Sequence, residues 1–260
     1  MTLDLRGKEA LVTGAERGLG LAISEALVRA GAHVGMLGRG RESLAQAAAR
    51  LNSGPGEAFP LTADVSDEEQ VVEAFKKLLK SRGRLDLLVN NAGIAGPTSP
   101  VTEITLKDWE HVLAVNLTGA FLCAREAAKI MVPAHGGKII NISSLAGTRA
   151  YALRSPYSSS KWGMVGLTRT LALELGPRNV QVNAICPGAV EGERMDRVIQ
   201  SRAETTGLSR EEIRKQFVSA TALGRFVNAR DIAGLVLFLA LPSGDNITGQ
   251  ALEVNAGASL

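Results

Sequence analysis

Two side chains able to carry out acid–base chemistry, Tyr157 and Lys161, lie four residues apart in a segment of helical periodicity, so they share one helix face. A phenol has a pKa of about 10 and is a poor base at neutral pH. A neighbouring ammonium group favours the phenolate and lowers that pKa. Tyr157 can then donate a proton to a carbonyl oxygen or accept one from an alcohol.

Ser144 follows an apolar run that predicts a strand, and its hydroxyl can serve the same oxygen. A hydrogen bond from this hydroxyl would stabilise negative charge as it develops there. Together the three residues predict proton transfer at a carbonyl or a secondary alcohol. Each also has an ordinary structural interpretation: a half-buried phenol, a solvated lysine, and a serine at the exit of a strand.

A glycine-rich turn follows the first predicted strand. Gly14, Gly18 and Gly20 are spaced Gly-x-x-x-Gly-x-Gly, and a helix is expected from Leu19. Such a turn lets backbone N–H groups approach a pyrophosphate, and the helix N-terminus adds partial positive charge. The spacing predicts a dinucleotide site, with a tight connection that binds nothing as the structural alternative.

Two arginines bear on which dinucleotide binds. The second predicted strand ends at Gly38 and Arg39 without an acidic residue, whereas NAD-binding proteins usually place a carboxylate there for the ribose 2′-hydroxyl. Arg17, inside the glycine turn, is expected on the same side of the cofactor. Because guanidinium groups bind phosphate through paired hydrogen bonds, the pair favours NADP (NADPH), with NAD as the alternative. Two solvated arginines are the structural alternative.

The elements that must position these residues alternate along the chain. Short apolar runs, typical of strands buried on both faces, alternate with longer segments of helical periodicity. This order predicts an α/β fold: a doubly wound parallel sheet of seven strands with helices on both faces, of the Rossmann type. Strands are expected at residues 10–13, 33–37, 58–61, 85–90, 138–143, 180–185 and 251–254. Helices are expected at residues 19–30, 41–51, 67–82, 106–132, 158–175 and 230–239.

We interpret residues 1–260 as a single dinucleotide-binding and catalytic domain. Residues 188–227 interrupt the alternation, because they are charged and helix-like without a strand pattern. A connection of this length favours a lid over the substrate. Ser66, three residues before Glu69, predicts a capping box for the third helix, and Thr105 is expected to start the next one.

Six motifs, taken in order, resemble those of the short-chain dehydrogenase/reductase family, and the resemblance covers essentially the whole chain. They are the glycine turn, Asn90-Asn91-Ala92-Gly93, Asn116, Ser144, Tyr157 with Lys161, and Pro187-Gly188. The resemblance implies that a nicotinamide supplies the hydride, while the protein positions the substrate and moves the proton.

The resemblance also implies roles for individual residues. Lys161 would hold the nicotinamide ribose hydroxyls, and Asn116 would hold a water for proton relay. The remaining cofactor residues would be Asp64 and Val65 at the adenine, Asn91, Ala92 and Gly93 after the fourth strand, and Pro187, Gly188 and Val190 near the nicotinamide. Asn91 has an equally good interpretation as a turn residue that stabilises the sheet.

One position departs from the family pattern. Members often carry threonine five residues after the proline of the Pro-Gly motif, and this chain has Gly192 there. The hydroxyl that reaches the cofactor is therefore absent. Glu191, Glu193 or Arg194 could compensate for the absent hydroxyl, but we expect these three to form a solvated charge cluster.

Composition excludes several other functions. The 29 basic and 26 acidic residues give a net charge of +3, and aromatic residues make up 4%, which favours neither nucleic-acid binding nor base stacking. Cys123 and Cys186 are expected to be buried and inert, and the three histidines lack metal-like spacing, so no metal is assigned. No apolar run reaches the roughly 20 residues of a membrane span. We expect a cytoplasmic protein without nucleic-acid or membrane partners.

The sequence thus predicts an oxidoreductase that transfers hydride between NADP(H) and a small-molecule carbonyl or secondary alcohol, 3-oxoacyl groups included. The alternatives are an NAD-dependent dehydrogenase of alcohols or polyols and a non-catalytic protein that senses NADP(H). An acidic acyl carrier would need basic residues such as Arg149, Arg154 and Arg178, but we expect each on the solvated surface. The resemblance implies a homotetramer formed through the helices at 106–132 and 158–175 and the last strand.

Overall fold

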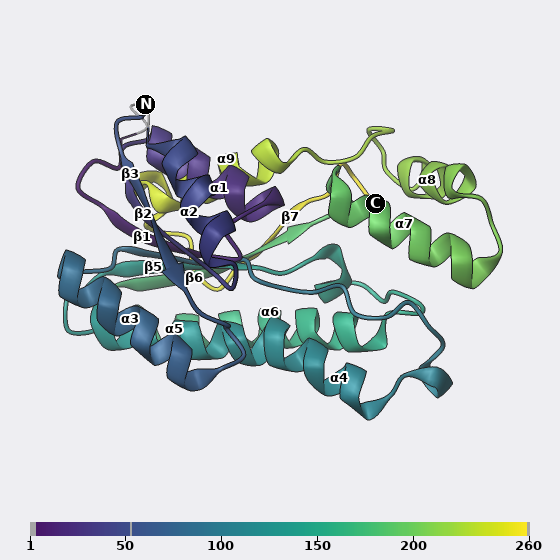
Figure 1. Cartoon of the computed structure of the whole chain (residues 1–260), viewed down its shortest axis with the longest axis horizontal. Coiled ribbons are helices and arrows are strands. Elements are labelled where there is room, and N and C mark those ends of the chain that lie inside the picture. Colours follow the sequence, from purple (N-terminus) through teal and green to yellow (C-terminus); the bar gives the residue numbers. More distant parts are fainter. Residues whose placement is uncertain (1–3, 53, 259–260) are drawn as a thin grey trace.

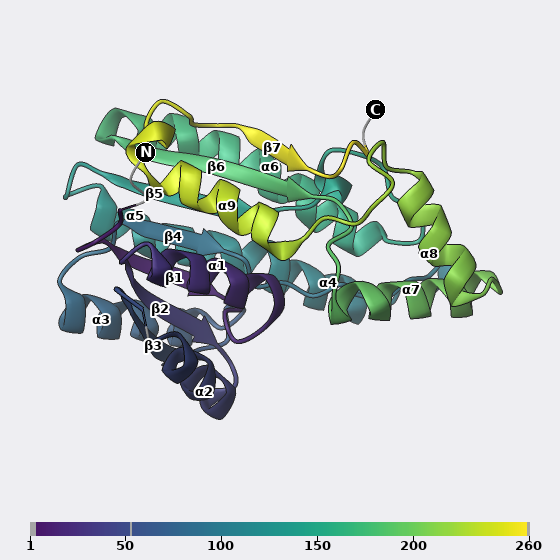
Figure 2. The same cartoon turned by 90° about the horizontal axis from the view of Figure 1, so that it is seen from above.

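Seven parallel strands form the centre of the molecule, in the order β3-β2-β1-β4-β5-β6-β7 (Figures 1 and 2). The computed structural model describes residues 4–52 and 54–258. The predicted doubly wound α/β fold is confirmed. The strands are β1 Glu9–Thr13, β2 His33–Gly38, β3 Glu57–Thr62, β4 Leu87–Asn90, β5 Gly137–Ile142, β6 Val180–Pro187 and β7 Ala251–Val254.

Helices cover both faces of this sheet (Figure 1). One face carries α1 Gly18–Arg29, α2 Arg41–Leu51 and α9 Ala229–Ala240; the other carries α3 Glu68–Arg82, α4 Leu106–Leu113, α5 Gly119–Met131 and α6 Ser155–Leu175. Successive strand side chains point to opposite faces, so Val12 joins the core under α1 and α9 while Leu11 joins the core under α3 and α5. Each face is therefore sealed by its own apolar cluster.

The helix expected at 106–132 contains a π-helical turn, Ala114–Thr118, between α4 and α5. Such turns interrupt the α-helical hydrogen-bond pattern and occur frequently at functional sites. Asn116 lies within this one. The helix expected from residue 158 begins earlier, at Ser155, with Pro156 in its first turn, where proline's missing N–H costs nothing. Tyr157 is consequently a first-turn residue of α6.

The expected cap of α3 was wrong by one residue. Asp67 is the N-cap, and its side chain accepts a hydrogen bond from the Gln70 N–H at 3.0 Å. The Ser66 hydroxyl instead donates to Asp64 Oδ1 at 2.6 Å, which takes it away from the helix. The prediction for Thr105 is confirmed, because its hydroxyl accepts from the Asp108 N–H at 3.0 Å.

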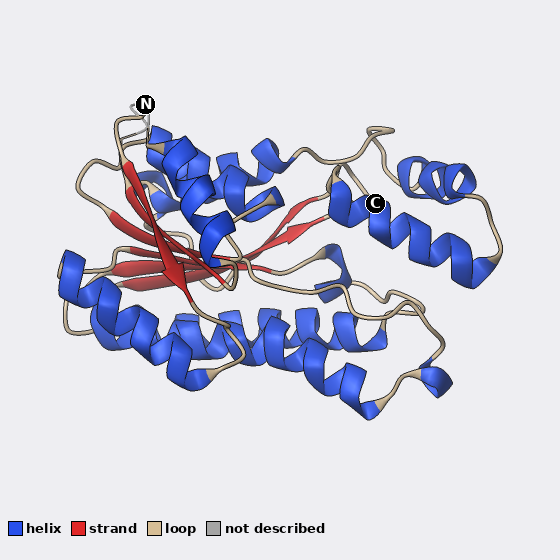
Figure 3. Cartoon of the chain, in the orientation of Figure 1, coloured by secondary structure: helices blue, strands red, loops and turns tan. Residues whose placement is uncertain are grey.

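The segment at 188–227 leaves the sheet and forms two helices, α7 Glu193–Thr206 and α8 Arg210–Ser219, beyond the carboxyl ends of the strands (Figure 3). Its two ends are tied by hydrogen bonds from Glu191 N to Val227 O (3.0 Å) and from Val227 N to Ala189 O (2.9 Å). A small separate core packs the two helices together; its buried members are Met195, Ile199, Ala203 and Ile213. We call residues 188–227 the lid segment.

Candidate active site

The strand order reverses between β1 and β4, and open α/β sheets bind ligands at the carboxyl ends of the strands at such a point. Here the glycine turn follows β1. Gly14 and Gly18 have φ of +62° and +54°, a region that favours glycine. A Cβ on Gly20 would lie 2.1 Å from the Gly14 carbonyl oxygen. Each of the three glycines is thus required by the backbone of the turn.

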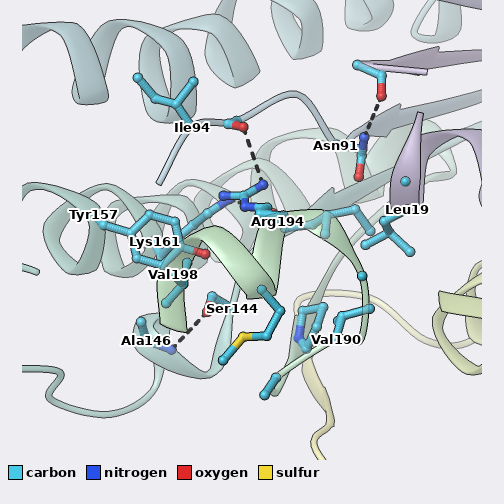
Figure 4. Close-up of a pocket in the computed structure, with 18 of the residues that line it drawn as sticks. Leu19, Asn91, Ile94, Ser144, Ala146, Tyr157, Lys161, Val190, Arg194 and Val198 are labelled. Atoms are coloured by element: carbon cyan, nitrogen blue, oxygen red, sulfur yellow. Dashed lines mark hydrogen bonds between the residues drawn. The ribbon is translucent and has the colours of Figure 1, made fainter. Parts of the chain in front are cut away.

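Asn91 ties the end of β4 to this turn. Its Nδ2 donates to the carbonyl oxygens of Thr13 and Gly14 at 2.9 and 3.1 Å, and its N–H donates to Thr13 Oγ1 at 3.0 Å (Figure 4). Asn91 therefore fixes the shape of the glycine turn. The structural interpretation of this residue holds, and it lies at the cleft as well.

One cleft of about 1080 Å³ runs from the glycine turn to the lid segment. This exceeds the upper end, about 1,000 Å³, of typical small-molecule pockets, so a dinucleotide and a small substrate have room together. Every residue predicted to bind the cofactor lies on its wall: Gly14, Arg17, Gly18, Leu19, Gly20, Arg39, Asp64, Val65, Asn91, Ala92, Gly93, Tyr157, Lys161, Pro187, Gly188 and Val190.

At the end of the cleft beside β2, the lining contains Arg17 and Arg39 and also two carboxylates, those of Asp64 and Glu16. Arg39 Nη1 lies 3.6 Å from Asp64 Oδ2. Burial opposes ionisation of Asp64, but hydrogen bonds from Ser66 and the charge of Arg39 hold the pKa of this carboxyl below its ordinary value. The second carboxylate, Glu16, escaped the sequence reasoning, which sought an acid only at the end of the second strand. A Cβ on Gly38 would lie 2.5 Å from Glu16 Oε2.

Tyr157 lies at the other end of the cleft, partly buried in the first turn of α6. Burial alone would raise the pKa of its phenol. The charges of Arg194, Lys161 and Arg154, together with a hydrogen bond from Ser144, outweigh burial and hold this pKa below its ordinary value. The ring centre lies 5.1 Å from the guanidinium carbon of Arg154 and 5.9 Å from both Lys161 Nζ and the guanidinium carbon of Arg194.

Lys161 is held from β5. Its ammonium group is buried and donates to the Ile142 carbonyl oxygen at 2.7 Å. The Ser143 hydroxyl donates to the Lys161 carbonyl oxygen at 3.0 Å, so the helix is fastened to the strand at this residue. Burial lowers the pKa of Lys161 to about 8, which leaves the group able to gain or lose a proton near neutral pH.

Ser144 lies two residues past the end of β5 and caps a short 3₁₀ turn, where its Oγ accepts a hydrogen bond from the Ala146 N–H at 3.1 Å (Figure 4). This contact leaves the hydroxyl proton for the hydrogen bond to Tyr157, and a substrate oxygen beside Tyr157 could accept it as well. The structure thus brings Ser144, Tyr157 and Lys161 together as predicted from their spacing.

Asn116 differs from the other three, because its side chain is buried and does not reach the cleft wall. Its Oδ1 accepts from the Ile94 N–H at 2.7 Å, and its Nδ2 donates to the Ile94 carbonyl oxygen and to Ser160 Oγ, both at 3.0 Å. The amide therefore fastens the loop after β4 to α6. Its role in proton relay stays a prediction.

Arg194 is exposed, as expected for a solvated cluster, and it also lines the cleft. Gly192 has a φ of +131°, which lets the chain turn into α7. Arg194 then extends into the cleft towards Tyr157 and Lys161, and its Nη1 donates to the Gly93 carbonyl oxygen at 3.3 Å (Figure 4). Glu191 and Glu193 stay exposed, paired with Arg214 and Arg197.

Arg154 corrects an expectation. It is 4% exposed, not a surface residue. Its Nη2 donates to the Ala95 carbonyl oxygen at 2.9 Å and its Nη1 to Thr98 Oγ1 at 3.2 Å. Sequence alone carried no signal that this side chain turns inward. Arg149 and Arg178 are exposed, as expected.

Other reactive side chains have structural surroundings. His33 Nδ1 lies 2.7 Å from Glu9 Oε1, and burial raises the pKa of the Cys123 thiol to about 12. Across residues 4–52 and 54–258, no three His, Cys, Asp or Glu side chains gather as a metal site would need. Within those same ranges no helix is long and apolar enough to span a bilayer.

The fold and this site define an oxidoreductase that uses a nicotinamide dinucleotide on a carbonyl or secondary alcohol. The chain belongs to the short-chain dehydrogenase family, whose model, described as short chain dehydrogenase, matches residues 8–203. It is 37% identical over 258 residues to the 3-oxoacyl-acyl-carrier-protein reductase FabG of Aquifex aeolicus, covering 99% of each chain.

Solved structures agree with this assignment. An NAD⁺-bound xylitol dehydrogenase superposes with a TM-score of 0.94 at 31% identity, covering 97% of this chain and 99% of its own. An actinorhodin polyketide ketoreductase with NADPH has a TM-score of 0.92 at 34% identity, covering 96% and 97%. One structure contains NAD⁺ and the other NADPH, so the similarity by itself does not decide which nucleotide this chain binds.

Proposed function

We propose that the protein is an NADP(H)-dependent reductase of small-molecule carbonyl compounds, with Tyr157 as its general acid. The observation that carries this proposal is the convergence of Tyr157, Lys161 and Ser144 at one end of a cleft whose other end is the glycine turn. A protein that only senses NADP(H) has no need of this acid–base group.

The residues of the cleft fit the cofactor. The glycine turn and the N-terminus of α1, which Arg17 does not cap with its side chain, would hold the pyrophosphate, and Lys161 would hold the nicotinamide ribose. When bound, the nicotinamide supplies or accepts the hydride. The protein supplies the proton: Tyr157 donates it to the carbonyl oxygen, Ser144 donates a hydrogen bond to that oxygen, and Asn116 positions the loop that carries Ile94.

The preference for NADP(H) rests on Arg17 and Arg39, which lie at the cleft wall beside β2. One observation favours NAD(H) as a second candidate. Glu16 brings a carboxylate to the same place, and one of its oxygens is buried with no hydrogen-bond partner in the described part of the chain. Such an oxygen could accept a hydrogen bond from a ribose 2′-hydroxyl and would repel a 2′-phosphate.

Titration with NADPH and with NADH at one salt concentration, followed by nicotinamide fluorescence, separates these two candidates. We expect tighter binding of NADPH, and a roughly 10-fold weaker affinity for it in Arg39→Ala, the loss of one charge-assisted hydrogen bond. Arg50→Ala, on the far end of α2 and away from the cleft, is the matched control. Tighter binding of NADH, weakened by Glu16→Gln, would replace NADP(H) by NAD(H).

We also propose that the lid segment covers the substrate and that the protein is a homotetramer. Exposed apolar side chains on the outer face of α5 and α6, namely Phe121, Trp162 and Leu173, support the second point. Ala124 and Ala127 of α5 belong to the sheet core and do not contribute to this face. An apolar helix face that is exposed to solvent favours association with another subunit.

A further inference from the structure

Four arginines line the cleft on the side of Tyr157 and α7: Arg154 before α6, and Arg194, Arg197 and Arg202 on α7. Arg197 pairs with Glu193, which also lines the cleft, and the other three form the cluster Arg154, Arg194 and Arg202. Their guanidinium carbons lie close to aromatic rings: 5.1 Å and 5.9 Å from the ring centre of Tyr157 for Arg154 and Arg194, and 6.0 Å from that of Tyr151 for Arg202. Two of them come from the lid segment, and Arg154 comes from outside it, so the cluster brings the lid segment and the start of α6 together at the cleft.

Within the described residues no carboxylate forms a salt bridge with these three arginines, because the glutamates of the cleft, Glu191 and Glu193, pair with other arginines. Neighbouring arginines of the lid segment are paired, Arg197 with Glu193 at 3.7 Å and Arg214 with Glu191 at 3.1 Å, but no salt bridge reaches Arg154, Arg194 or Arg202. Burial, together with the charges of Arg194 and Arg202, lowers the pKa of Arg154. Three like charges in one cleft oppose each other unless a negative group joins them.

Two donors of the cluster are also unused. The Nε atoms of Arg154 and Arg202 are buried and have no hydrogen-bond partner in the described part of the chain. Buried polar groups are normally satisfied, and an orphaned donor calls for an explanation. Arg154 is 4% exposed, and its two Nη groups are held by Ala95 and Thr98, which fixes the direction of the free Nε–H.

Stabilisation of the Tyr157 phenolate accounts for only part of this arrangement. Arg194 and Arg154 lie over the Tyr157 ring, but Arg202 lies against Tyr151 and Phe217, 5.5 Å from the latter ring centre. Arg202 is also not among the residues predicted to bind the cofactor. A third cation in this position serves a ligand group other than the reacting oxygen.

We propose that the substrate is a short oxo acid, or the corresponding hydroxy acid, whose carboxylate is bound by Arg154 and Arg202 while its carbonyl meets Tyr157. Each arginine would donate its unused Nε–H to the carboxylate as a charge-assisted hydrogen bond. Because Arg154 lies 5.1 Å from the Tyr157 ring centre, a carboxylate bound there is only a few bonds from the reacting carbon. The inference rests on the proposed function, since it names the substrate class of the same site.

The test compares kcat/KM for 3-oxobutanoate and 4-oxopentanoate with kcat/KM for their methyl esters, which keep the ketone and lose the charge. Wild type is expected to prefer each acid by roughly 10-fold or more. Arg202→Met should lower the acid-to-ester ratio by roughly 10- to 100-fold, the loss expected for a charge-assisted hydrogen bond. Arg154→Met should lower the ratio in the same way. If the substitution of the buried Arg154 prevents folding, the result for Arg202→Met decides the test.

Lys215→Met is the matched control, since it removes a charge of the lid segment that Glu211 already balances and that does not line the cleft. Its acid-to-ester ratio should equal that of wild type. A fall as large as that of Arg202→Met would assign the effect to the general field of the lid segment and overturn the proposal.

Three further outcomes would overturn the inference. If the esters are reduced as well as the acids, the carboxylate is not recognised, while the proposed function stands. If dihydroxyacetone phosphate is reduced far better than both acids, the cluster binds phosphate. If neither acids, esters nor the neutral ketone 2,3-butanedione is reduced, the inference fails together with the proposed function.

Discussion

Replacing Lys161 by methionine should make the protein more stable and inactive at the same time. The two side chains have similar volumes, and Lys161 is 3% exposed. Burial lowers its pKa to about 8 from an ordinary 10.5, a difference that corresponds to about 3 kcal/mol of cost for the charged form. The variant also loses the hydrogen bond to Ile142, which costs about 1–2 kcal/mol of stability. The net expected gain at pH 7 is about 1–2 kcal/mol.

The pH dependence of this gain follows from proton linkage. Below pH 8 the lysine is charged in both states and opposes folding in full. Between about pH 8 and 10.5 the unfolded chain binds more protons than the folded one, so this group's contribution to wild-type stability rises with pH. Lys161→Met lacks that rise. The difference in unfolding free energy between the variant and wild type should therefore become smaller from about pH 8 to 10.5.

Urea unfolding of wild type and Lys161→Met at pH 7 and at pH 10, at equal protein concentration and without cofactor, measures both quantities. Lys80→Met, at an exposed position of α3, is the control and should show no such pH-dependent difference. A Lys161→Met protein less stable than wild type at pH 7, or a difference that stays constant with pH, would refute the reasoning. Turnover should be lost at either pH.

Three other predictions follow from the structure. Gly20→Ala places a Cβ 2.1 Å from a backbone oxygen and should weaken cofactor binding more than 10-fold by fluorescence titration, whereas Gly166→Ala, with nothing within 4 Å, should bind as wild type does. Arg194→Met removes a cation that lowers the pKa of Tyr157, so the rise of alcohol oxidation with pH should move to higher pH. Light scattering should give the mass of a tetramer, and Trp162→Glu should reduce it; a monomeric wild type would contradict the assembly.

Local spacing was enough to predict the glycine turn and the Tyr157–Lys161 pair, because both depend on neighbours within one turn or one helix. Apolar periodicity likewise predicted the sheet, since strands buried on both faces carry a strong signal. The directions of Arg154 and Arg194 were not predicted, because they depend on distant partners, the Ala95 and Gly93 carbonyl oxygens. The direction of a long charged side chain is decided by tertiary packing, which a residue's own sequence neighbours do not encode.

The π-helical turn at Ala114–Thr118 escaped for a related reason. Its residues have ordinary helical propensity, and the change in hydrogen bonding goes with the anchoring of Asn116 to Ile94, 22 residues away. Ser66 and Asp67 show why the exact capping residue of α3 could not be predicted from residue type. Both are good caps by type, and the competing contact with Asp64 leaves the task to Asp67.

The most direct test of the central claim is the turnover of Tyr157→Phe. This change removes one oxygen from the cleft and leaves the glycine turn intact. The account predicts that the variant binds NADPH, or NADH if that is the cofactor, within a few-fold of wild type, and that carbonyl reduction falls at least roughly 1,000-fold because the proton donor is gone. Reduction at close to the wild-type rate would contradict the assignment of Tyr157 as the general acid, and with it the account of this site.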